Sequence, residues 1–251
     1  MATLLTWPFA ILFAAAFAAG AMNALAGGGS FVTFPALLLT GLDPRAANIT
    51  STIALFPGQV TSGLAGRALV GGIGRMPFVG LAAISLGGGA VGALLLLATP
   101  PSFFAALVPY LVLFATAVFA WGSFIRRPRT NANPMPSRLS GLMQFAISIY
   151  GGYFGGGIGF LMLAALTVAG MAMRNAGATK NALAAAMKAS AVLVFLLAPD
   201  VAWPQAAVVA IAALAGGLGG AWLLQRVNEK LLRGFVVAVG IALTIGLFLR
   251  G

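Results

Sequence analysis

The chain has 251 residues, of which 61% are hydrophobic and only 7% are charged, and its mean hydropathy is +1.05. Soluble domains carry roughly a quarter of charged residues, so this composition excludes a water-soluble protein and indicates one that contacts the lipid bilayer. The chain contains no cysteine and no histidine, which excludes disulfides, thiol nucleophiles and metals or haem held by these side chains. Because the basic residues behind its net charge of +11 are dispersed in short loops, we expect no nucleic-acid partner and no cofactor.

Long apolar runs follow one another along almost the whole chain. Seven of them have about 20 residues or more, enough for a helix to cross a bilayer core of roughly 30 Å. They are residues 3–26, 46–66, 76–98, 102–125, 178–198, 204–225 and 231–250. Two apolar pieces, 30–41 and 158–171, are shorter, and residues 140–157 are borderline. The predicted fold class is therefore an all-α integral membrane protein with 8–10 transmembrane segments, some of them short or broken.

The longest polar stretch, residues 126–138, separates two membrane halves, 1–125 and 139–251. A short loop with this many arginines is expected in the cytoplasm. Counting spans outward from it places most basic residues on the same side, and both termini and the loop aspartates outside. The inner residues are Arg67, Arg75, Arg174, Lys180, Arg226, Lys230 and Arg233, the outer ones are Asp43 and Asp200, and Arg45 and Arg250 are exceptions. The count requires residues 1–42 and 139–172 each to form a short, tilted or re-entrant hairpin.

The two halves resemble each other at an offset of 128 to 129 residues. Aligning the glycine run 27–29 with 155–157 pairs several further positions, and GGGAVGALLL at 87–96 matches AGGLGGAWLL at 215–224. The further pairs are Gly41 with Gly170, Arg45 with Arg174, Thr50 with Thr179, Thr52 with Asn181, and Gln59 with Lys188. By the charge count, the loop at 43–50 faces outward and its counterpart at 172–179 faces inward. This predicts two inverted repeats of about five segments each, an arrangement typical of secondary transporters with a midplane site.

Each glycine run directly precedes a short apolar segment. Such a run exposes backbone N–H groups, and the N-terminus of the following helix carries a partial positive charge, which together favour an anion. The alternative is that the glycines only let helices pack closely, which we expect at 87–92 and 216–220. Ser30 and Thr33 add hydroxyl donors in the first half, and Tyr153 adds one in the second. The candidate residues here are Asn23, Gly27, Gly28, Gly29, Ser30, Thr33, Tyr153, Gly155, Gly156 and Gly157.

Lys188 is predicted to lie near the middle of a membrane helix, about ten residues into the run 178–198. Charged residues at this depth are costly and usually functional. Thr52 and Gln59 on one helix, and Asn181 and Lys188 on its counterpart, are each seven residues apart, so each pair shares a helix face. The alternative for Lys188 is that its long side chain snorkels to a membrane interface.

Carboxylates are missing from the predicted midplane, since all three acidic residues fall at segment ends. A cation site or a carboxylate proton relay would need one there. A buried lysine, hydroxyl groups and glycine-rich helix ends therefore favour a small anion as the substrate, with proton coupling left open.

Several of these motifs resemble one known family. AGGGSFVTFPALLLTGLDPRAANITST at the start, the second glycine-rich segment, RNAGATKNALAAAMKAS after it, and a length near 250 residues are similar to the sulfite exporter TauE/SafE family. The resemblance implies a permease of the prokaryotic inner membrane that moves sulfite, sulfonates or related sulfur-containing anions, usually outward. The second half departs from the pattern, because GGGIGF lacks a hydroxyl residue or proline after the glycines.

The sequence leaves four functional readings to compare. The favoured one is a secondary transporter of small sulfur-containing anions, without enzymatic activity. A passive channel or a permease for another small anion is the alternative, and it differs in lacking coupling to a proton gradient. A membrane enzyme lacks the usual acid–base and nucleophilic residues, and a subunit of a larger complex lacks a docking domain. Whether the protein forms a homodimer stays open.

Overall fold

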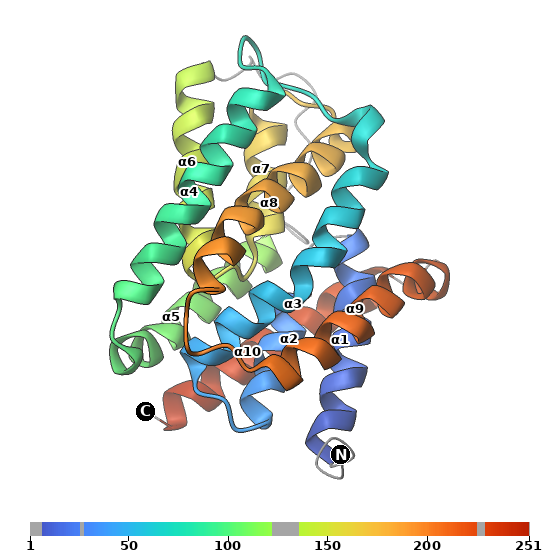
Figure 1. The fold of residues 1–251 in the computed structure, drawn as a ribbon. Coiled ribbons are helices and arrows are strands. Elements are labelled where there is room, and N and C mark those ends of the chain that lie inside the picture. The colour runs from blue at the N-terminus through green and yellow to red at the C-terminus, as the bar shows by residue number, and fades with distance from the viewer. Residues whose placement is uncertain (1–6, 26–27, 122–135, 225–228, 251) are drawn as a thin grey trace.

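The computed structural model describes residues 7–25, 28–121, 136–224 and 229–250 (Figure 1). Within these ranges the chain is helical, apart from short loops and one isolated bridge between Ile73 and Met76. The predicted linker, 126–138, lies almost wholly outside the described residues, so the proposed division into 1–125 and 139–251 stays a prediction.

Ten α-helices and one short 3-10 helix are described. They are α1 (Trp7–Leu25), α2 (Ser30–Leu39), α3 (Pro44–Ala65), η2 (Arg67–Leu69), α4 (Phe78–Ala98), α5 (Pro101–Ala120), α6 (Ser137–Tyr153), α7 (Ile158–Val168), α8 (Met173–Phe195), α9 (Trp203–Leu224) and α10 (Glu229–Arg250). Every apolar run predicted from the sequence corresponds to one of them. The two short runs form α2 and α7, with 10 and 11 residues, and each follows a longer helix as the hairpin prediction requires.

Two of the described helices, α4 and α5, are both long and apolar enough to cross a bilayer by length and composition. Helices α3 and α8 have similar lengths, but polar residues along them lower their hydropathy. These two polar helices lie side by side in the contact map and in Figure 1, so their polar residues face the protein interior rather than lipid.

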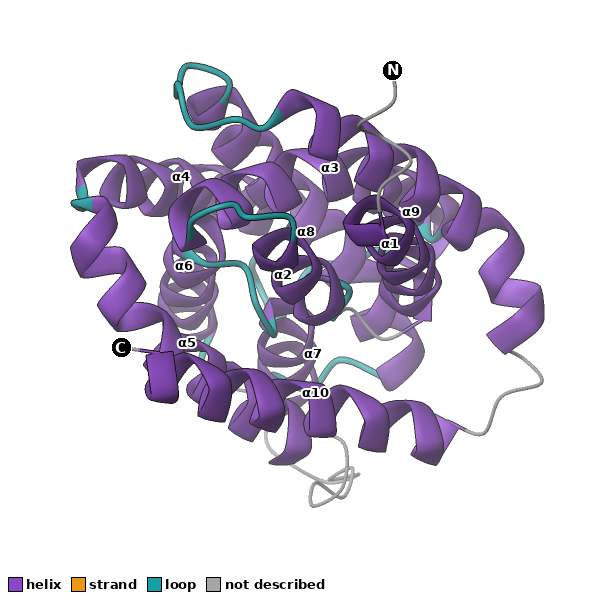
Figure 2. Ribbon diagram, turned by 90° about the horizontal axis from the view of Figure 1, so that it is seen from below, coloured by secondary structure: helices purple, strands orange, loops and turns teal. Residues whose placement is uncertain are grey.

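Long helices surround the two short ones. Figure 2 shows α2, α7 and α8 near the centre, with α1 and α9, α4 and α6, and α5 and α10 around them. The packing partners form matched sets: α1 packs on α9 as α4 packs on α6, and α3 packs on α9 as α4 packs on α8. In addition, α3 packs on α8, and α5 packs on α10.

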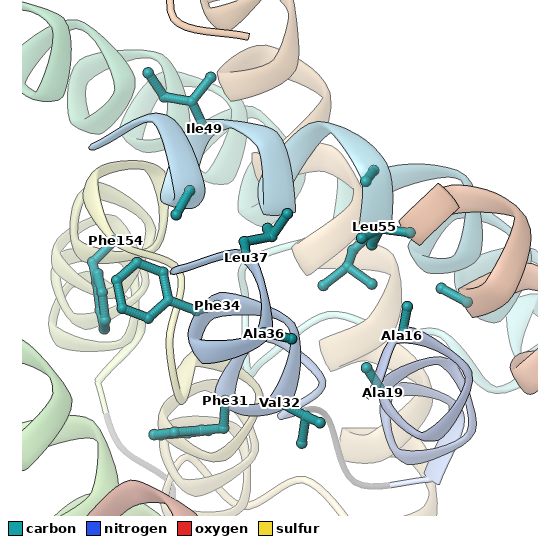
Figure 3. Close-up of a cluster of buried hydrophobic side chains, with 14 of the residues drawn as sticks. Ala16, Ala19, Phe31, Val32, Phe34, Ala36, Leu37, Ile49, Leu55 and Phe154 are labelled. Carbon is teal, nitrogen blue, oxygen red and sulfur yellow. The ribbon is translucent and has the colours of Figure 1, made fainter. Parts of the chain in front are cut away.

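Helix α2 is packed into the largest cluster of buried apolar side chains (Figure 3). Phe31, Phe34 and Leu37 are almost fully buried, and the ring of Phe34 meets Phe154 edge-on at 5.7 Å between centroids. A helix that begins inside a protein leaves backbone N–H groups without intrahelical partners. The first turns of α2 and α7 therefore need other partners, and these turns define the candidate site.

Glycines bring α4 and α6 into close backbone contact. A Cβ atom at Gly92 would collide with the carbonyl oxygen of Ile149, and one at Gly88 would lie 2.6 Å from the Cβ of Ser148. Similarly, a Cβ at Gly216 of α9 would collide with the backbone of Phe17 in α1. The expectation that these glycines serve helix packing is therefore confirmed at these positions.

Replacing Gly92 with alanine is expected to destabilise the protein, because the added methyl group has no space against α6. Overpacking typically costs about 1–3 kcal/mol. Gly87→Ala, in the same helix, is the matched control, since a Cβ atom at that position would meet no other atom within 4 Å. Thermal unfolding of the purified proteins should show a lower midpoint for Gly92→Ala only. Equal midpoints would show that the α4–α6 contact is looser than described.

Candidate functional site

The first turns of α2 and α7 meet at one small cavity. Gly28 and Ser30 line it from the first half, and Gly155, Gly157, Ile158 and Gly159 line it from the second. Its volume is about 20 Å³, which is room for about one water molecule. The two glycine runs, which lie 128 residues apart in the sequence, are thus brought together as predicted.

Asn23 at the end of α1 occupies the backbone donors of the first glycine run. Its side-chain oxygen accepts hydrogen bonds from the N–H groups of Gly28 at 3.2 Å and Gly29 at 2.9 Å. We expected these N–H groups to be free to bind an anion, and the structure corrects this, because Asn23 already satisfies them. Gly27 lies outside the described residues.

Free backbone donors follow the second glycine run, whose first N–H, that of Gly155, donates to the backbone oxygen of Tyr150 at 3.4 Å. Gly157 adopts a left-handed conformation with φ of 72°, which favours glycine, and no side chain caps the start of α7. The N–H groups of Ile158 and Gly159 have no hydrogen-bond acceptor among the described residues, and both residues line the cavity. Together with the partial positive charge of the helix end, they make the start of α7 an electropositive side of the cavity.

Helix α8 supplies two buried lysines to the same cavity. Lys188 is 4% exposed and Lys180 is 3% exposed, and neither has a hydrogen-bond or ion-pair partner among the described residues. Lys188 is thus buried as predicted, and its depth in the bilayer stays a prediction. Lys180 was counted from the sequence only among the basic residues of the cytoplasmic side, and its place in this cavity, inside α8, was not predicted. Lys180 precedes Lys188 by eight residues, which is slightly more than two helical turns. Helix periodicity could therefore have placed Lys180 near the helix face of Lys188.

Gln59 and Asn181 join α3 to α8 beside the lysines. The side-chain nitrogen of Gln59 donates to the backbone oxygen of Asn181 at 3.2 Å, and both residues line the cavity. The side-chain oxygen of Asn181 is buried without a partner. Because amide oxygen and nitrogen can exchange places by rotation, this group can present either a donor or an acceptor to a ligand.

A second cavity of about 10 Å³ lies on the other side of α2. Its polar lining comes from Ser30, Asn48, Ser51 and Thr52, and Gly156 closes it from the second half. Thr52 and Gln59 were expected to face one interior. They are both buried, but they line different cavities, with Ser30 common to the two.

Three further candidates line neither cavity: Thr33, Tyr153 and Gly29. Thr33 pairs with the hydroxyl of Ser51 at 2.8 Å and donates to the carbonyl of Gly29 at 3.3 Å. Tyr153 donates its phenol to Thr99 at 3.4 Å. Thr33 therefore helps to hold α2 against α3, and the N–H of Gly29 donates to the capping side chain of Asn23. A part for these three residues in substrate binding stays a prediction.

An ion pair links the start of α3 to the loop after α8. Arg45, at the start of α3, contacts Asp200 at 3.0 Å and donates to the carbonyl of Thr99 at 2.9 Å. Arg45 therefore ties α3 to the loop after α4 and to the loop after α8. Asp43 caps α3 by accepting from the N–H groups of Arg45 and Ala46.

A larger cavity of about 280 Å³ adjoins the small cavity at Asn23. It lies between α1, α3 and α9 and shares Asn23 with the small cavity. The residues that line it on α3 are Leu55, Gly58, Thr61, Ser62 and Ala65, so it follows the second half of that helix away from Arg45.

In the part of the chain that the structure describes, helices alone, with polar inner helices and a buried cationic cavity, fit a membrane protein that handles a small solute. The sequence model described as "Sulfite exporter TauE/SafE" matches residues 12–247. The chain belongs to the TauE/SafE sulfite exporter family.

The curated relatives cover nearly the same length. The chain is 30% identical over 241 residues to a "Probable membrane transporter protein ORF9" of Sinorhizobium sp, covering 95% of this chain and 91% of the relative. It is 29% identical to a "Probable membrane transporter protein" of Haemophilus influenzae, covering 94% and 92%. It is 27% identical to "Probable membrane transporter protein YfcA" of Escherichia coli K12, covering 91% and 85%. No solved structure matches the chain.

Proposed function

We propose that the protein is a secondary transporter that moves small sulfur-containing anions, such as sulfite, outward across the prokaryotic inner membrane. The observation that carries this proposal is the unpartnered Lys188, which shares a cavity with the free N–H groups at the start of α7. No carboxylate of the described residues lines that cavity. Because an isolated buried charge is costly, a bound anion gives the lysine the partner it lacks.

Two inverted repeats, α1–α5 and α6–α10, form the proposed transport unit. The counterparts are α1 and α6, α2 and α7, α3 and α8, α4 and α9, and α5 and α10. Exchanging each helix for its counterpart turns the α1–α9 contact into the α6–α4 contact, and it leaves the α3–α8 and α5–α10 contacts unchanged. Such an exchange is what a pseudo-two-fold axis between the halves produces. The cavity lies where this axis would pass, as in transporters built from inverted repeats.

Matched details at both ends support the same repeat. Gly41 and Gly170, paired in the sequence alignment, follow α2 and α7 with φ of 89° and 96°. Thr50 accepts a hydrogen bond from the N–H of Ala202, and its counterpart Thr179 accepts one from Gly71, both at 3.1 Å. Each of these bonds ties the start of one repeat's third helix to a loop of the other repeat.

The proposed orientation places the arginine-rich end in the cytoplasm. Arg67, Arg75, Arg138 and Arg174 are exposed, and their loops meet through bonds of Arg75 to Ser137 and Gly71 to Thr179. Figure 1 shows the start of α1 and the end of α10 at the other end. Arg45, an exception in the sequence count, lies at that other end with its charge paired to Asp200, so it no longer opposes the rule.

A single cysteine at position 137 tests this orientation, since the chain has no native cysteine. We expect Ser137→Cys to stay unlabelled by an impermeant thiol reagent added to intact cells, and to react in inside-out vesicles. Asp43→Cys, at the opposite end, is the matched control and should show the reverse pattern. Labelling of Ser137→Cys from outside would reverse the proposed topology.

The two ends of the site differ in the way that alternating access requires. The Arg45–Asp200 pair closes the outer end, and the 280 Å³ cavity extends from Asn23 toward the cytoplasmic end. In the proposed orientation, substrate entering from the cytoplasm would meet Asn23 before the lysines. This geometry fits loading from inside, as an exporter needs.

Flux measurements in proteoliposomes test the proposal. Sulfite, thiosulfate, sulfate and a sulfonate are offered separately, each with and without a pH gradient. Uphill movement of at least one sulfur-containing anion, driven by the gradient, is expected. Strictly downhill electrogenic flux would identify a channel, and the absence of anion flux from folded protein would overturn the proposal.

A further inference from the structure

Two positive charges and no negative one line the small cavity. Lys180 and Lys188 are both buried, both border the cavity, and both lack a partner among the described residues. The two acids whose side chains the structure describes do not compensate them, because Asp43 caps α3 and Asp200 pairs with Arg45.

The neutral lining adds few acceptors for these ammonium groups. Asn23 uses its side-chain oxygen on Gly28 and Gly29, whereas the side-chain oxygen of Asn181 is an acceptor without a partner. The free N–H groups of Ile158 and Gly159 are donors and add positive potential. The lining therefore matches a ligand that carries several acceptor atoms and more than one negative charge.

We propose that Lys180 is a second anion-binding residue, and that the two lysines together make the site selective for doubly charged oxyanions over singly charged ones. This inference rests on the proposed function. A dianion neutralises both ammonium groups, whereas a monoanion leaves one of them buried and uncompensated, which is costly. An organosulfonate whose only ionised group is its sulfonate carries a single charge and therefore belongs to the disfavoured class.

The test compares anions of similar shape and different charge. Sulfite at mildly alkaline pH and sulfate carry two negative charges, and methanesulfonate has the shape of sulfate with one charge. Affinities are measured by thermal shift and confirmed by competition in the flux assay. We expect the parent protein to bind the better of the two dianions at least about ten-fold more tightly than methanesulfonate, as expected for one additional charge-assisted contact.

Replacing Lys180 with methionine should remove this selectivity. We expect dianion affinity to fall roughly ten- to a hundred-fold, with methanesulfonate affinity changed much less. Lys180→Gln serves as a second neutral variant if the methionine protein does not fold. Arg174→Met, which removes an exposed charge from the same helix, should bind both kinds of anion as the parent does.

The outcomes separate this inference from the proposed function. If methanesulfonate binds the parent as tightly as the dianions, or if Lys180→Met weakens both classes equally, the selectivity inference is wrong while the anion site stands. If no anion binds the folded parent protein, the proposed function fails and the inference fails with it.

Discussion

Lys188→Ala is expected to weaken anion binding by roughly ten- to a hundred-fold, since a charge-assisted hydrogen bond contributes about 1.5–3 kcal/mol. Lys188 is buried, lines the cavity and has no partner among the described residues. The variant should fold at least as well as the parent protein, because it no longer buries an uncompensated charge. Lys188→Arg should be intermediate, because a planar guanidinium replaces a compact ammonium.

Anion-dependent thermal shift and flux measure this effect in the same preparations. Arg174→Ala is the matched control, because it removes one positive charge from an exposed position of the same helix. Parental affinity and flux in Lys188→Ala would show that the lysine is not at the binding site. Equal loss in Arg174→Ala would assign the effect to the overall charge of the protein.

Asn23→Ala is expected to lower the stability of the protein and reduce transport. The side-chain oxygen of Asn23 satisfies the N–H groups of Gly28 and Gly29 at the start of α2. Leaving buried donors unpaired costs about 1–3 kcal/mol for each group. Because α2 borders both small cavities through Ser30, displacement of its first turn should also disturb the site.

Asn23→Asp separates the two consequences. The carboxylate keeps an acceptor for both N–H groups and carries a charge that suits a helix N-terminus, so thermal unfolding should stay near that of the parent. It also places a negative charge beside Lys180 and Lys188, so anion affinity should fall. A stable Asn23→Ala protein with parental flux would show that the cap is dispensable.

The helices could be predicted from the sequence because each depends on local features. Apolar runs near 20 residues gave the long helices, and α2 and α7 are short because glycine runs precede them and Gly41 and Gly170 follow them at positive φ. The TauE/SafE resemblance is confirmed by the match over residues 12–247. Boundaries shifted by a few residues where capping decides them, as when Asp43 starts α3 two residues before the apolar run.

The candidate site was only partly predictable. Residues of both glycine runs and Lys188 line one cavity, and the glycine pattern and the position of the lysine within an apolar run had singled them out. Other features depend on partners far away in the sequence: Thr33 turns to Ser51, and Tyr153 turns to Thr99. Lys180 was missed as a cavity residue because it was considered only in the count of charges by side, although its spacing from Lys188 in the same predicted helix pointed to the cavity.

A structure determined with selenite, the selenium analogue of sulfite, tests the central claim most directly, because anomalous scattering locates selenium without reference to the protein. The account predicts one peak in the cavity between the start of α7 and the lysines of α8, near Gly159, Lys180 and Lys188. The peak should disappear in crystals of Lys188→Ala. Selenium bound elsewhere in the transporting protein, or an unchanged peak in Lys188→Ala, would contradict it.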